Sequence, residues 1–228
     1  MRTKNCLVTG ASSGIGRETS IQLSHHAKHI YIVGRNVSKL EEVNDLIVSN
    51  GCECTIVPLD LCEENSIENL SREISKKDSS IDYLILCAGI ISQLFPINSI
   101  DYEKFKEIID LNYIANFRFL KNFHLLLKNS KNAQLVVLSI NPDYIESLYW
   151  GIYKPVMLAL NELIMTYANE NKKTGIKAKI LCPRGVNTPF RENIMPGENK
   201  DNLVEPSIVA KKLVELLSSN ETAKIINI

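Results

Sequence analysis

The 228-residue sequence lacks any apolar run that approaches the roughly 20 residues needed for a membrane-spanning helix. It also lacks an excess of either charge, because lysine plus arginine and aspartate plus glutamate each number 26. A balanced charge provides no basic stripe of the kind that binds nucleic acid. The sequence therefore argues against a membrane protein and against a nucleic-acid binder.

Clusters of metal-binding residues are missing too. Cys52 and Cys54 are the one close pair among the six cysteines, and their spacing is too short for the usual zinc knuckle. The four histidines have no cysteine or carboxylate at ligand spacing. No basic segment followed by an apolar stretch and a cleavage site begins the sequence, so we expect no secretory signal. These features predict reduced thiols, no metal site and a cytoplasmic location.

What the sequence does contain is a regular alternation of short β-rich runs and longer helical patterns. The expected strands are residues 5–10, 29–34, 54–60, 81–89, 133–140, 175–183 and 223–228. The expected helices are residues 14–26, 37–49, 64–76, 102–128, 150–170 and 207–219. This alternation predicts βαβ units in one Rossmann-like α/β domain over residues 1–228. Its doubly wound parallel sheet should have about seven strands, with helices on both faces.

Residues 188–206 break the alternation with three prolines, one glycine and many polar side chains. Such a composition predicts a loop rather than a helix or strand. A loop of this length in a compact domain is usually either a lid over a site or a disordered excursion. We expect a substrate lid here, with the disordered excursion as the alternative.

A glycine-rich stretch, "TGASSGIG" at residues 9–16, follows the first expected strand and opens the first expected helix. Glycines at a strand-to-helix turn let the backbone approach a pyrophosphate closely. The helix N-terminus then directs its N–H groups and its positive dipole at the phosphates. The spacing and the position together predict a dinucleotide site.

The stretch resembles the Thr-Gly-x-x-x-Gly-x-Gly turn of the short-chain dehydrogenase/reductase family. The resemblance extends over nearly the whole chain, through "LD" at 60–61, "CAG" at 87–89, "LNYIANF" at 111–117 and "CPRGVNTPF" at 182–190. It implies a nicotinamide dinucleotide cofactor and an oxidoreductase acting on a small-molecule carbonyl or alcohol. The cofactor-binding residues that it implies are Gly10, Ser12, Ser13, Gly14, Ile15, Gly16, Arg35, Asp60, Leu61, Ala88, Gly89, Val186 and Thr188.

The choice of nicotinamide depends on the end of the second strand, where an acidic residue would accept hydrogen bonds from the ribose 2′-OH of NAD. This chain has Gly34 there, followed by Arg35. No carboxylate would repel a 2′-phosphate, and a guanidinium can form two hydrogen bonds to it, so NADP is favoured over NAD. The alternative is that Arg35 stacks on adenine or faces solvent.

The resemblance also implies a catalytic tyrosine, a lysine four residues later, a serine on the preceding strand and an asparagine, here Asn112. Two registers compete for the tyrosine and the lysine. Taking Lys154 as the lysine puts Trp150 in the tyrosine position, whereas taking Tyr153 as the tyrosine puts Met157 in the lysine position.

The flanking residues decide the register. The family usually has a glutamate seventeen residues after its tyrosine, and counting from Tyr153 reaches Glu170. We therefore take Tyr153 as the catalytic tyrosine, with Met157 replacing the lysine. Lys154 is the next residue along the helix, about 100° around its axis, so it should point away from that face unless its long side chain curls back.

The serine position is less regular. Thirteen residues before Tyr153, where the family usually has its serine, this chain has Ile140, and Ser139 is one residue earlier. Neighbouring side chains on a strand face opposite ways, so Ser139 needs a bulge to reach the site as the catalytic serine. Arg184 replaces a family glycine near the nicotinamide, where it could obstruct the cofactor or supply a cation.

A tyrosine without a neighbouring cation should keep a pKa near ~10 and stay protonated at pH 7. It would be a poor general base for alcohol oxidation but an available general acid for carbonyl reduction. The sequence therefore predicts a slow NAD(P)(H)-dependent oxidoreductase of the short-chain dehydrogenase/reductase type that favours reduction with NADPH. The alternative is a catalytically inactive nucleotide-binding protein with a regulatory or binding role.

The expected helices 102–128 and 150–170 are apolar over more of their circumference than packing on a sheet requires. In the family, the corresponding helices form a four-helix interface between two subunits. The resemblance therefore implies a homodimer, and the alternative is that the two helices cover each other within a monomer.

Overall fold

The computed structural model describes residues 2–91, 94–144 and 148–228. Within them, seven parallel strands form one sheet in the order β3-β2-β1-β4-β5-β6-β7. The strands are β1 Lys4–Thr9, β2 Ala27–Gly34, β3 Glu53–Pro58, β4 Tyr83–Leu86, β5 Gln134–Leu138, β6 Lys177–Cys182 and β7 Lys224–Asn227. This sheet confirms the predicted Rossmann-like, doubly wound α/β fold.

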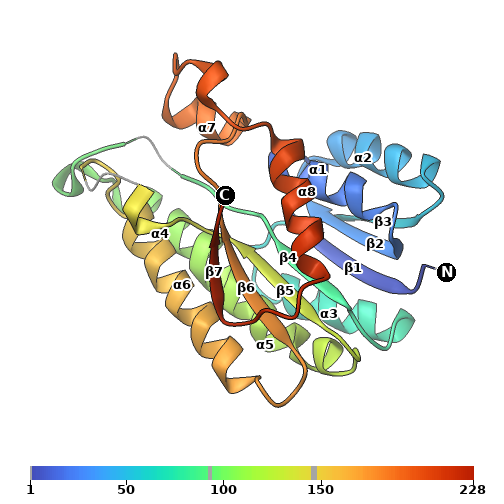
Figure 1. Ribbon diagram of the computed structural model, residues 1–228. Helices are drawn as coiled ribbons and strands as arrows, with labels where there is room; N and C mark the ends of the chain where they lie inside the picture. Colours follow the sequence, from blue (N-terminus) through green and yellow to red (C-terminus); the bar gives the residue numbers. More distant parts are fainter. Residues whose placement is uncertain (1, 92–93, 145–147) are drawn as a thin grey trace.

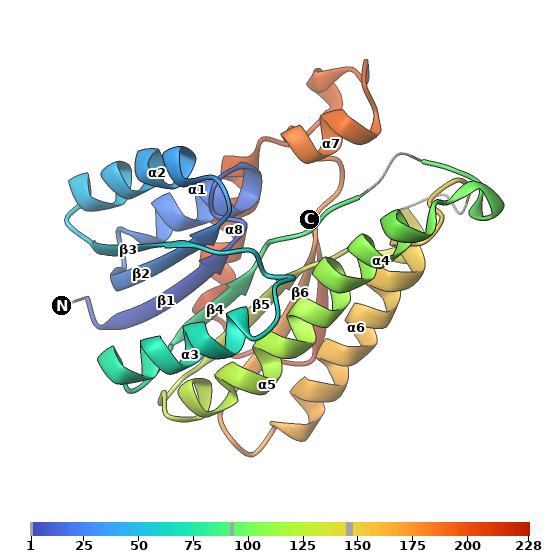
Figure 2. The same ribbon diagram turned by 180° about the vertical axis from the view of Figure 1, so that it is seen from behind.

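Helices cover both faces of the sheet (Figures 1 and 2). One layer holds α1 Gly14–Leu23, α2 Val37–Ser49 and α8 Pro206–Leu217. The other holds α3 Ser66–Lys77, α4 Tyr102–Ile109, α5 Ala115–Lys128 and α6 Tyr153–Glu170. A further short helix, α7 Pro189–Ile194, stands apart from both layers, beyond the carboxyl ends of the strands.

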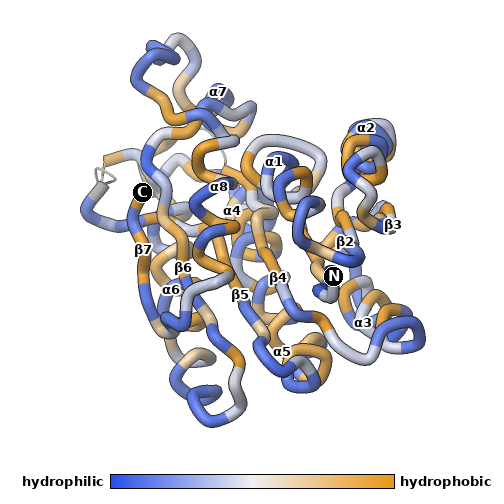
Figure 3. Tube along the Cα trace, turned by 45° about the vertical axis from the view of Figure 1, so that its right-hand side comes forward, coloured by the Kyte–Doolittle hydropathy of each residue, from blue (hydrophilic) through white to orange (hydrophobic). Residues whose placement is uncertain are grey.

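The central strands are buried on both sides because successive side chains enter different cores, whereas the edge strands β3 and β7 are more exposed. On β1, Leu7 packs with α3, α5 and α6, whereas Cys6 and Val8 pack with α1, α2 and α8. In Figure 3 the hydrophobic stretches accordingly gather in the strands, and the connecting loops are mostly hydrophilic. This double burial explains why the strand sequences read as nearly continuous apolar runs.

The segment 102–128, predicted as one helix, differs from that prediction at its centre. Helices α4 and α5 are joined by a π-helical turn, Asp110–Ile114, in which the Ala115 N–H donates to the Asp110 carbonyl. The wider turn accommodates one extra residue, and such turns are frequent at functional sites. Asn112 lies in the middle of it.

The prediction of an irregular loop at 188–206 is wrong for part of its length. Thr188 caps α7 by accepting a hydrogen bond from the Arg191 N–H, and Pro189 occupies the first helical position, where its missing N–H costs nothing. A 3₁₀ turn follows at Lys200–Asn202. A bridge between Val186 and Val204 closes the base of the excursion. Local capping therefore orders a segment whose overall composition indicated a loop.

The strand order reverses between β1 and β4, which are neighbours in the sheet although the chain leaves them towards opposite edges. Ligands of open α/β sheets bind beyond the carboxyl ends of the strands at this point.

In the described part of the chain, no helix is both long enough and apolar enough to cross a bilayer. Nor do those residues bring three histidine, cysteine or acidic side chains close enough to hold a metal ion.

Candidate functional site

A cavity of about 1090 Å³ opens at the carboxyl ends of β1, β4, β5 and β6. It extends from the glycine-rich turn after β1 to Tyr153 at the start of α6. Each site residue named from the sequence contributes to its lining: Gly10, Ser12, Ser13, Gly14, Ile15, Gly16, Arg35, Asp60, Leu61, Ala88, Gly89, Asn112, Ser139, Tyr153, Val186 and Thr188. Residues spread from 10 to 188 are therefore brought to one place by the fold.

The glycine-rich turn has no room for side chains at two of its positions. A Cβ on Gly10 would lie 2.9 Å from the Ala88 nitrogen, and Gly10 also has a φ of 66°, which favours glycine. A Cβ on Gly16 would lie 2.4 Å from the Gly10 carbonyl oxygen. The turn is thus a tight cradle of exposed backbone, as a bound diphosphate requires.

The start of α1 is open towards this cradle. Ser13 occupies the N-cap position, and its side chain makes no capping hydrogen bond within the described residues. The first-turn N–H groups of α1 are therefore available to an anionic ligand, and the helix dipole favours negative charge at the same point.

One threonine joins the two central strands beneath the cavity. The Thr9 hydroxyl oxygen accepts hydrogen bonds from the Cys87 and Ala88 N–H groups, each at 3.1 Å. This contact holds the loop after β4 against the turn after β1. The Cys87 thiol lines the cavity, and burial raises its pKa to about 12, so it remains a neutral thiol at pH 7.

Arg35 and Asp60 lie at the far end of the cavity from Tyr153. The Arg35 guanidinium is 3.9 Å from the Asp60 carboxylate, and the two side chains are 71% and 38% exposed. An ion pair this open contributes little to stability. The guanidinium is therefore free of strong constraint and can turn towards an incoming phosphate.

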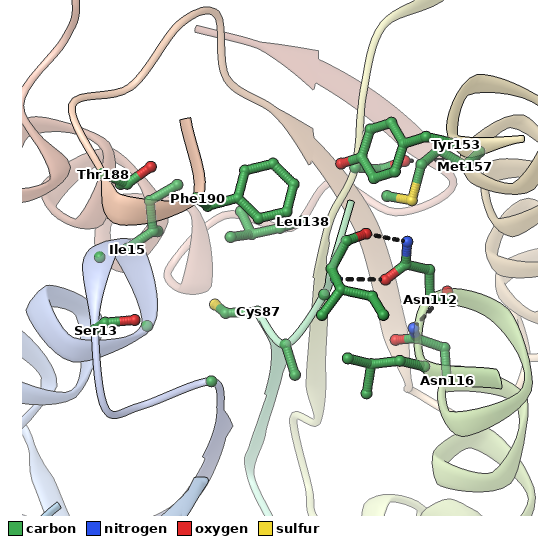
Figure 4. A pocket seen from close by; sticks show the side chains of 18 of the residues that line it. Ser13, Ile15, Cys87, Asn112, Asn116, Leu138, Tyr153, Met157, Thr188 and Phe190 are labelled. Carbon is green, nitrogen blue, oxygen red and sulfur yellow. Dashed lines mark hydrogen bonds between the residues drawn. The ribbon is translucent and has the colours of Figure 1, made fainter. Parts of the chain in front are cut away.

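Asn112 is held firmly by the loop after β4 (Figure 4). Its Oδ1 accepts from the Ile90 N–H at 2.8 Å, and its Nδ2 donates to the Ile90 carbonyl at 2.7 Å. The Asn116 side chain donates to the Asn112 main-chain carbonyl at 2.8 Å. The π-helical turn and the β4 loop are thus fixed to each other beside Tyr153 and Met157.

The Tyr153 phenol is buried and points into the cavity (Figure 4). Its ring centroid lies 6.0 Å from that of Trp150 and 6.0 Å from that of Phe190. Burial raises the pKa of Tyr153 well above its usual value, and the nearby Cys182 thiol raises it further. Among the described residues, no side chain hydrogen-bonds the phenol oxygen.

One helical turn after Tyr153, Met157 lines the same cavity with its thioether (Figure 4). Its side chain is 6% exposed. Lys154 does not contribute to the described lining of this cavity, in agreement with its expected place on another side of α6. The position that faces the phenol along the helix therefore carries an uncharged side chain.

Ser139 lies directly after β5 on the side that faces α6. Its hydroxyl donates to the Met157 main-chain carbonyl at 3.4 Å. Ile140 follows and also lines the cavity, and its carbonyl accepts a hydrogen bond from Asn161. Ser139 is therefore near the site, but in this structure its hydroxyl is directed at the α6 backbone.

Two aromatic side chains were not singled out as site residues by the sequence reasoning. Trp150 entered it only as a rejected position for the tyrosine, and Phe190 only as part of a motif. Both line the cavity beside the Tyr153 ring. A signal was present for Phe190, since it is the one aromatic residue in the segment 188–206.

Comparison with known proteins places this geometry in a family. Among curated proteins, the chain is 24% identical over 221 residues to the uncharacterized oxidoreductase YciK of Escherichia coli K12, covering 96% of this chain and 87% of YciK. An alcohol dehydrogenase from the archaeon Thermococcus sibiricus, complexed with 5-hydroxy-NADP, is 24% identical with a TM-score of 0.88, over 99% and 95% of the two chains.

A structure from Escherichia coli CFT073 that is complexed with NADPH is 23% identical with a TM-score of 0.91, over 100% of this chain and 97% of that chain. The family model described as short chain dehydrogenase matches residues 4–199, which span the glycine-rich turn, Asn112 and Tyr153. With most of its length matched, the chain belongs to the short chain dehydrogenase family of oxidoreductases.

Proposed function

We propose that this protein is an NADP(H)-dependent oxidoreductase that favours reduction of a small-molecule carbonyl and turns over slowly. The observation that carries the proposal is that a single cavity joins the glycine cradle and Arg35 to the buried Tyr153 phenol. A dinucleotide lying along this cavity would place its two ends at these two groups. When bound, the nicotinamide would supply the hydride.

The cofactor fits the residues present. The cradle at Gly10 and Gly16 and the open start of α1 would hold the diphosphate, with Ser12, Gly14 and Ile15 alongside. Arg35 would bind the 2′-phosphate that distinguishes NADP from NAD. The remaining cofactor contacts would come from Asp60, Leu61, Ala88, Gly89, Val186 and Thr188. The NADPH and 5-hydroxy-NADP in the two related structures support NADP as the cofactor.

The catalytic roles that we assign depend on the protonation state of the Tyr153 phenol. Tyr153 would donate its proton to the carbonyl oxygen as negative charge develops there, because its raised pKa keeps the phenol protonated at neutral pH. The Ser139 hydroxyl would give up its hydrogen bond to the Met157 carbonyl and donate to the substrate oxygen instead, which would orient that oxygen. Asn112 would act as a positioning residue, since both ends of its amide are occupied by Ile90.

One observation favours a second candidate, a nucleotide-binding protein that has lost catalysis. Met157 is buried in the position from which a lysine would tune the Tyr153 phenol, and a thioether cannot lower a phenol pKa or donate a hydrogen bond. The cofactor cradle does not depend on this position. Binding without turnover is therefore a coherent alternative for the same structure.

Two further parts of the proposal concern the surroundings of the site. Residues 188–206 would act as a substrate lid, because Phe190, Arg191 and Ile194 of this segment line the cavity. A homodimer would form through α5 and α6, and the exposed Phe117 and Leu125 on α5 support that surface.

The test is a fluorescence titration with NADPH and with NADH, followed by NADPH oxidation with a panel of carbonyl compounds. We expect saturable NADPH binding that Arg35→Leu weakens about tenfold, as loss of a charge-assisted hydrogen bond predicts, with NADH binding unchanged. Slow turnover supports the oxidoreductase. Binding without turnover of any carbonyl supports the second candidate, and no saturable binding contradicts both.

A further inference from the structure

The surroundings of the Tyr153 phenol are mostly apolar, with Ser139 and Asn112 as the polar side chains already described. Trp150 and Phe190 flank its ring, Met157 lies one helical turn away, and Ile140 and Ile194 complete this part of the wall. Burial is the larger of the two causes that raise the Tyr153 pKa, as expected where little polar surface surrounds the phenol. A substrate carbon next to the reacting carbonyl would therefore contact hydrocarbon and aromatic side chains.

Several polar side chains near this end of the cavity are already bound by the protein. Arg191 forms two hydrogen bonds to Glu198, at 2.7 and 2.8 Å. Asn141 donates to Asn227 at 3.0 Å, and Asn112 is bound to Ile90. A polar substituent that reaches Arg191, Asn141 or Asn112 would have to displace these contacts, whereas an apolar one would leave them intact.

The apolar wall continues from the cavity to the surface through Trp150. A backbone bridge joins Trp150 to Phe95, so that the segments 94–100 and 148–152 lie together. Their packing is tight, because a Cβ on Gly151 would lie 2.6 Å from the Ile100 side chain. In Figures 1 and 2, the 94–100 segment extends beyond the carboxyl end of the sheet, on the side of α4 and α6.

The outer part of these paired segments exposes large apolar side chains. Ile97 is 77% exposed, Leu148 69%, Tyr149 56% and Phe95 41%. Tyr149 has a φ of 65°, an uncommon value for a bulky residue, and such conformations cluster at ligand-binding sites. With this backbone conformation, the side chains of Leu148 and Tyr149 are exposed to solvent while that of Trp150 is buried. We call Phe95, Ile97, Leu148 and Tyr149 the apolar rim.

We propose that the substrate is a hydrophobic carbonyl compound whose reacting end reaches Tyr153 and whose hydrocarbon tail leaves the cavity past Trp150 along the apolar rim. This inference rests on the proposed function for its reacting end. The tail is favoured over a polar substituent because the exit path offers side chains that gain by being covered, each buried methylene contributing about 0.8 kcal/mol.

Trp150 provides a direct probe, since the chain contains one tryptophan. Without cofactor no ketone can be reduced, so 2-butanone, 2-hexanone, 2-octanone and 2-decanone can be titrated as ligands while the Trp150 emission is recorded. Quenching of N-acetyltryptophanamide by each ketone gives the non-specific background. We expect Kd to fall about fourfold per added methylene, the ratio that corresponds to the methylene contribution above.

The rim is tested with Ile97→Asn and Leu148→Asn, two substitutions at exposed positions that leave the core unchanged. Each should raise the Kd of 2-decanone at least threefold and leave that of 2-butanone unchanged, because the short ketone does not reach the rim. Val48→Asn is the matched control, since Val48 is 52% exposed on α2, far from the cavity lining. Thermal unfolding monitored by circular dichroism checks that the variants fold alike.

A Kd that does not depend on chain length, or rim variants that behave like Val48→Asn, would overturn the inference. Turnover assays then separate it from the proposed function. Ketones that bind with the expected length dependence but are not reduced by NADPH leave the apolar site standing and contradict the reductase. Reduction of pyruvate, a small anionic carbonyl, without any preference for long ketones supports the reductase and contradicts the apolar site.

Discussion

A phenol and a thioether stand one helical turn apart on α6, where Tyr153 and Met157 both line the cavity. A lysine at the second position would favour the ionised phenol through its charge. With methionine there, burial acts on the phenol without that opposing influence, and the proton stays on Tyr153. In the proposed function, this pair would set both the rate and the preferred direction of the reaction.

Met157→Lys should raise kcat/KM for NADPH-dependent carbonyl reduction by about tenfold or more, because a cation one turn away brings the Tyr153 pKa closer to the working pH. Tyr153→Phe in the same background should remove the gain. Steady-state kinetics measures both, and Met157→Leu, which conserves volume, is the control. An unchanged rate in Met157→Lys would mean that position 157 does not tune the phenol.

The pH dependence tests the same residue without substitution. Because burial raises the Tyr153 pKa, the acid form persists to higher pH than in a free tyrosine. Activity that needs this proton is present below the raised pKa and is lost only above it. We expect kcat/KM for reduction to show no fall from Tyr153 ionisation between pH 6 and pH 9. A fall with an apparent pKa below 9, absent from Tyr153→Phe, would contradict this interpretation.

Spacing along one helix predicted that Tyr153 and Met157 share a face, and both line the cavity, while their catalytic roles stay a prediction. Ser139 shows where such reading ends. Its position in the chain was known, but the direction of its hydroxyl depends on how closely α6 packs on β5, where the Met157 carbonyl accepts its hydrogen bond. A contact between a side chain of one element and the backbone of the next leaves no periodic pattern in the sequence.

At the scale of the elements, the segment 188–206 between β6 and α8 is held by two contacts. A backbone bridge between Val186 and Val204 joins its two ends, and an ion pair links Arg191 to Glu198 within it. The side chains of that pair are 22% and 27% exposed, and the Arg191 guanidinium lowers the pKa of Glu198. Bidentate geometry makes this pair more effective than an ordinary surface ion pair.

Glu198→Gln should loosen the 188–206 segment, because it removes the charge that the Arg191 guanidinium binds at two oxygens. With about 1 kcal/mol for a well-formed pair, limited proteolysis within the segment should become about fivefold faster. Peptide mass spectrometry locates and times the cuts. Glu192→Gln is the matched control, since the Glu192 pair with Lys200 is about 60% exposed on both sides (59% and 61%). Equal rates in both variants would show that the Arg191–Glu198 pair does not hold the segment.

The central strands were predictable because burial on both faces gives each of them a nearly continuous apolar run. The π-helical turn at 110–114 was not, since it depends on Asn112 binding the Ile90 backbone and on Asn116 binding the Asn112 carbonyl. For α7, the cap at Thr188 was visible in the sequence, but the prolines and polar residues around it indicated a loop.

At the scale of the whole molecule, the outer surface of α5 is a candidate contact between subunits, because it exposes large apolar side chains. On α5 and at its start, Leu125 is 69% exposed, Phe117 45% and Ile114 38%. Helix α6 lies beside α5 on the same face of the sheet (Figure 2). A surface of this kind is covered efficiently by its own copy about a two-fold axis, since each partner then buries the same patch.

Leu125→Glu should convert the proposed homodimer into a monomer, because it places a charge in the centre of a desolvated contact. Sedimentation velocity at several concentrations measures the change in mass. Val48→Glu, a charge at an exposed position on α2, should leave the mass unchanged. A wild-type protein that sediments as a monomer at all concentrations would rule out the dimer.

The tight contact between Gly10 and Ala88 limits which amino-acid substitutions the centre of this molecule can accept. Not even a methyl group fits between the two loops at the centre of the sheet, and the Thr9 hydroxyl fixes their spacing. We therefore expect substitutions to be tolerated better at the periphery, at residues 94–100 and 188–206, than at this contact. New substrate ranges should be reachable by exchanging those two segments while the middle of the sheet is left alone.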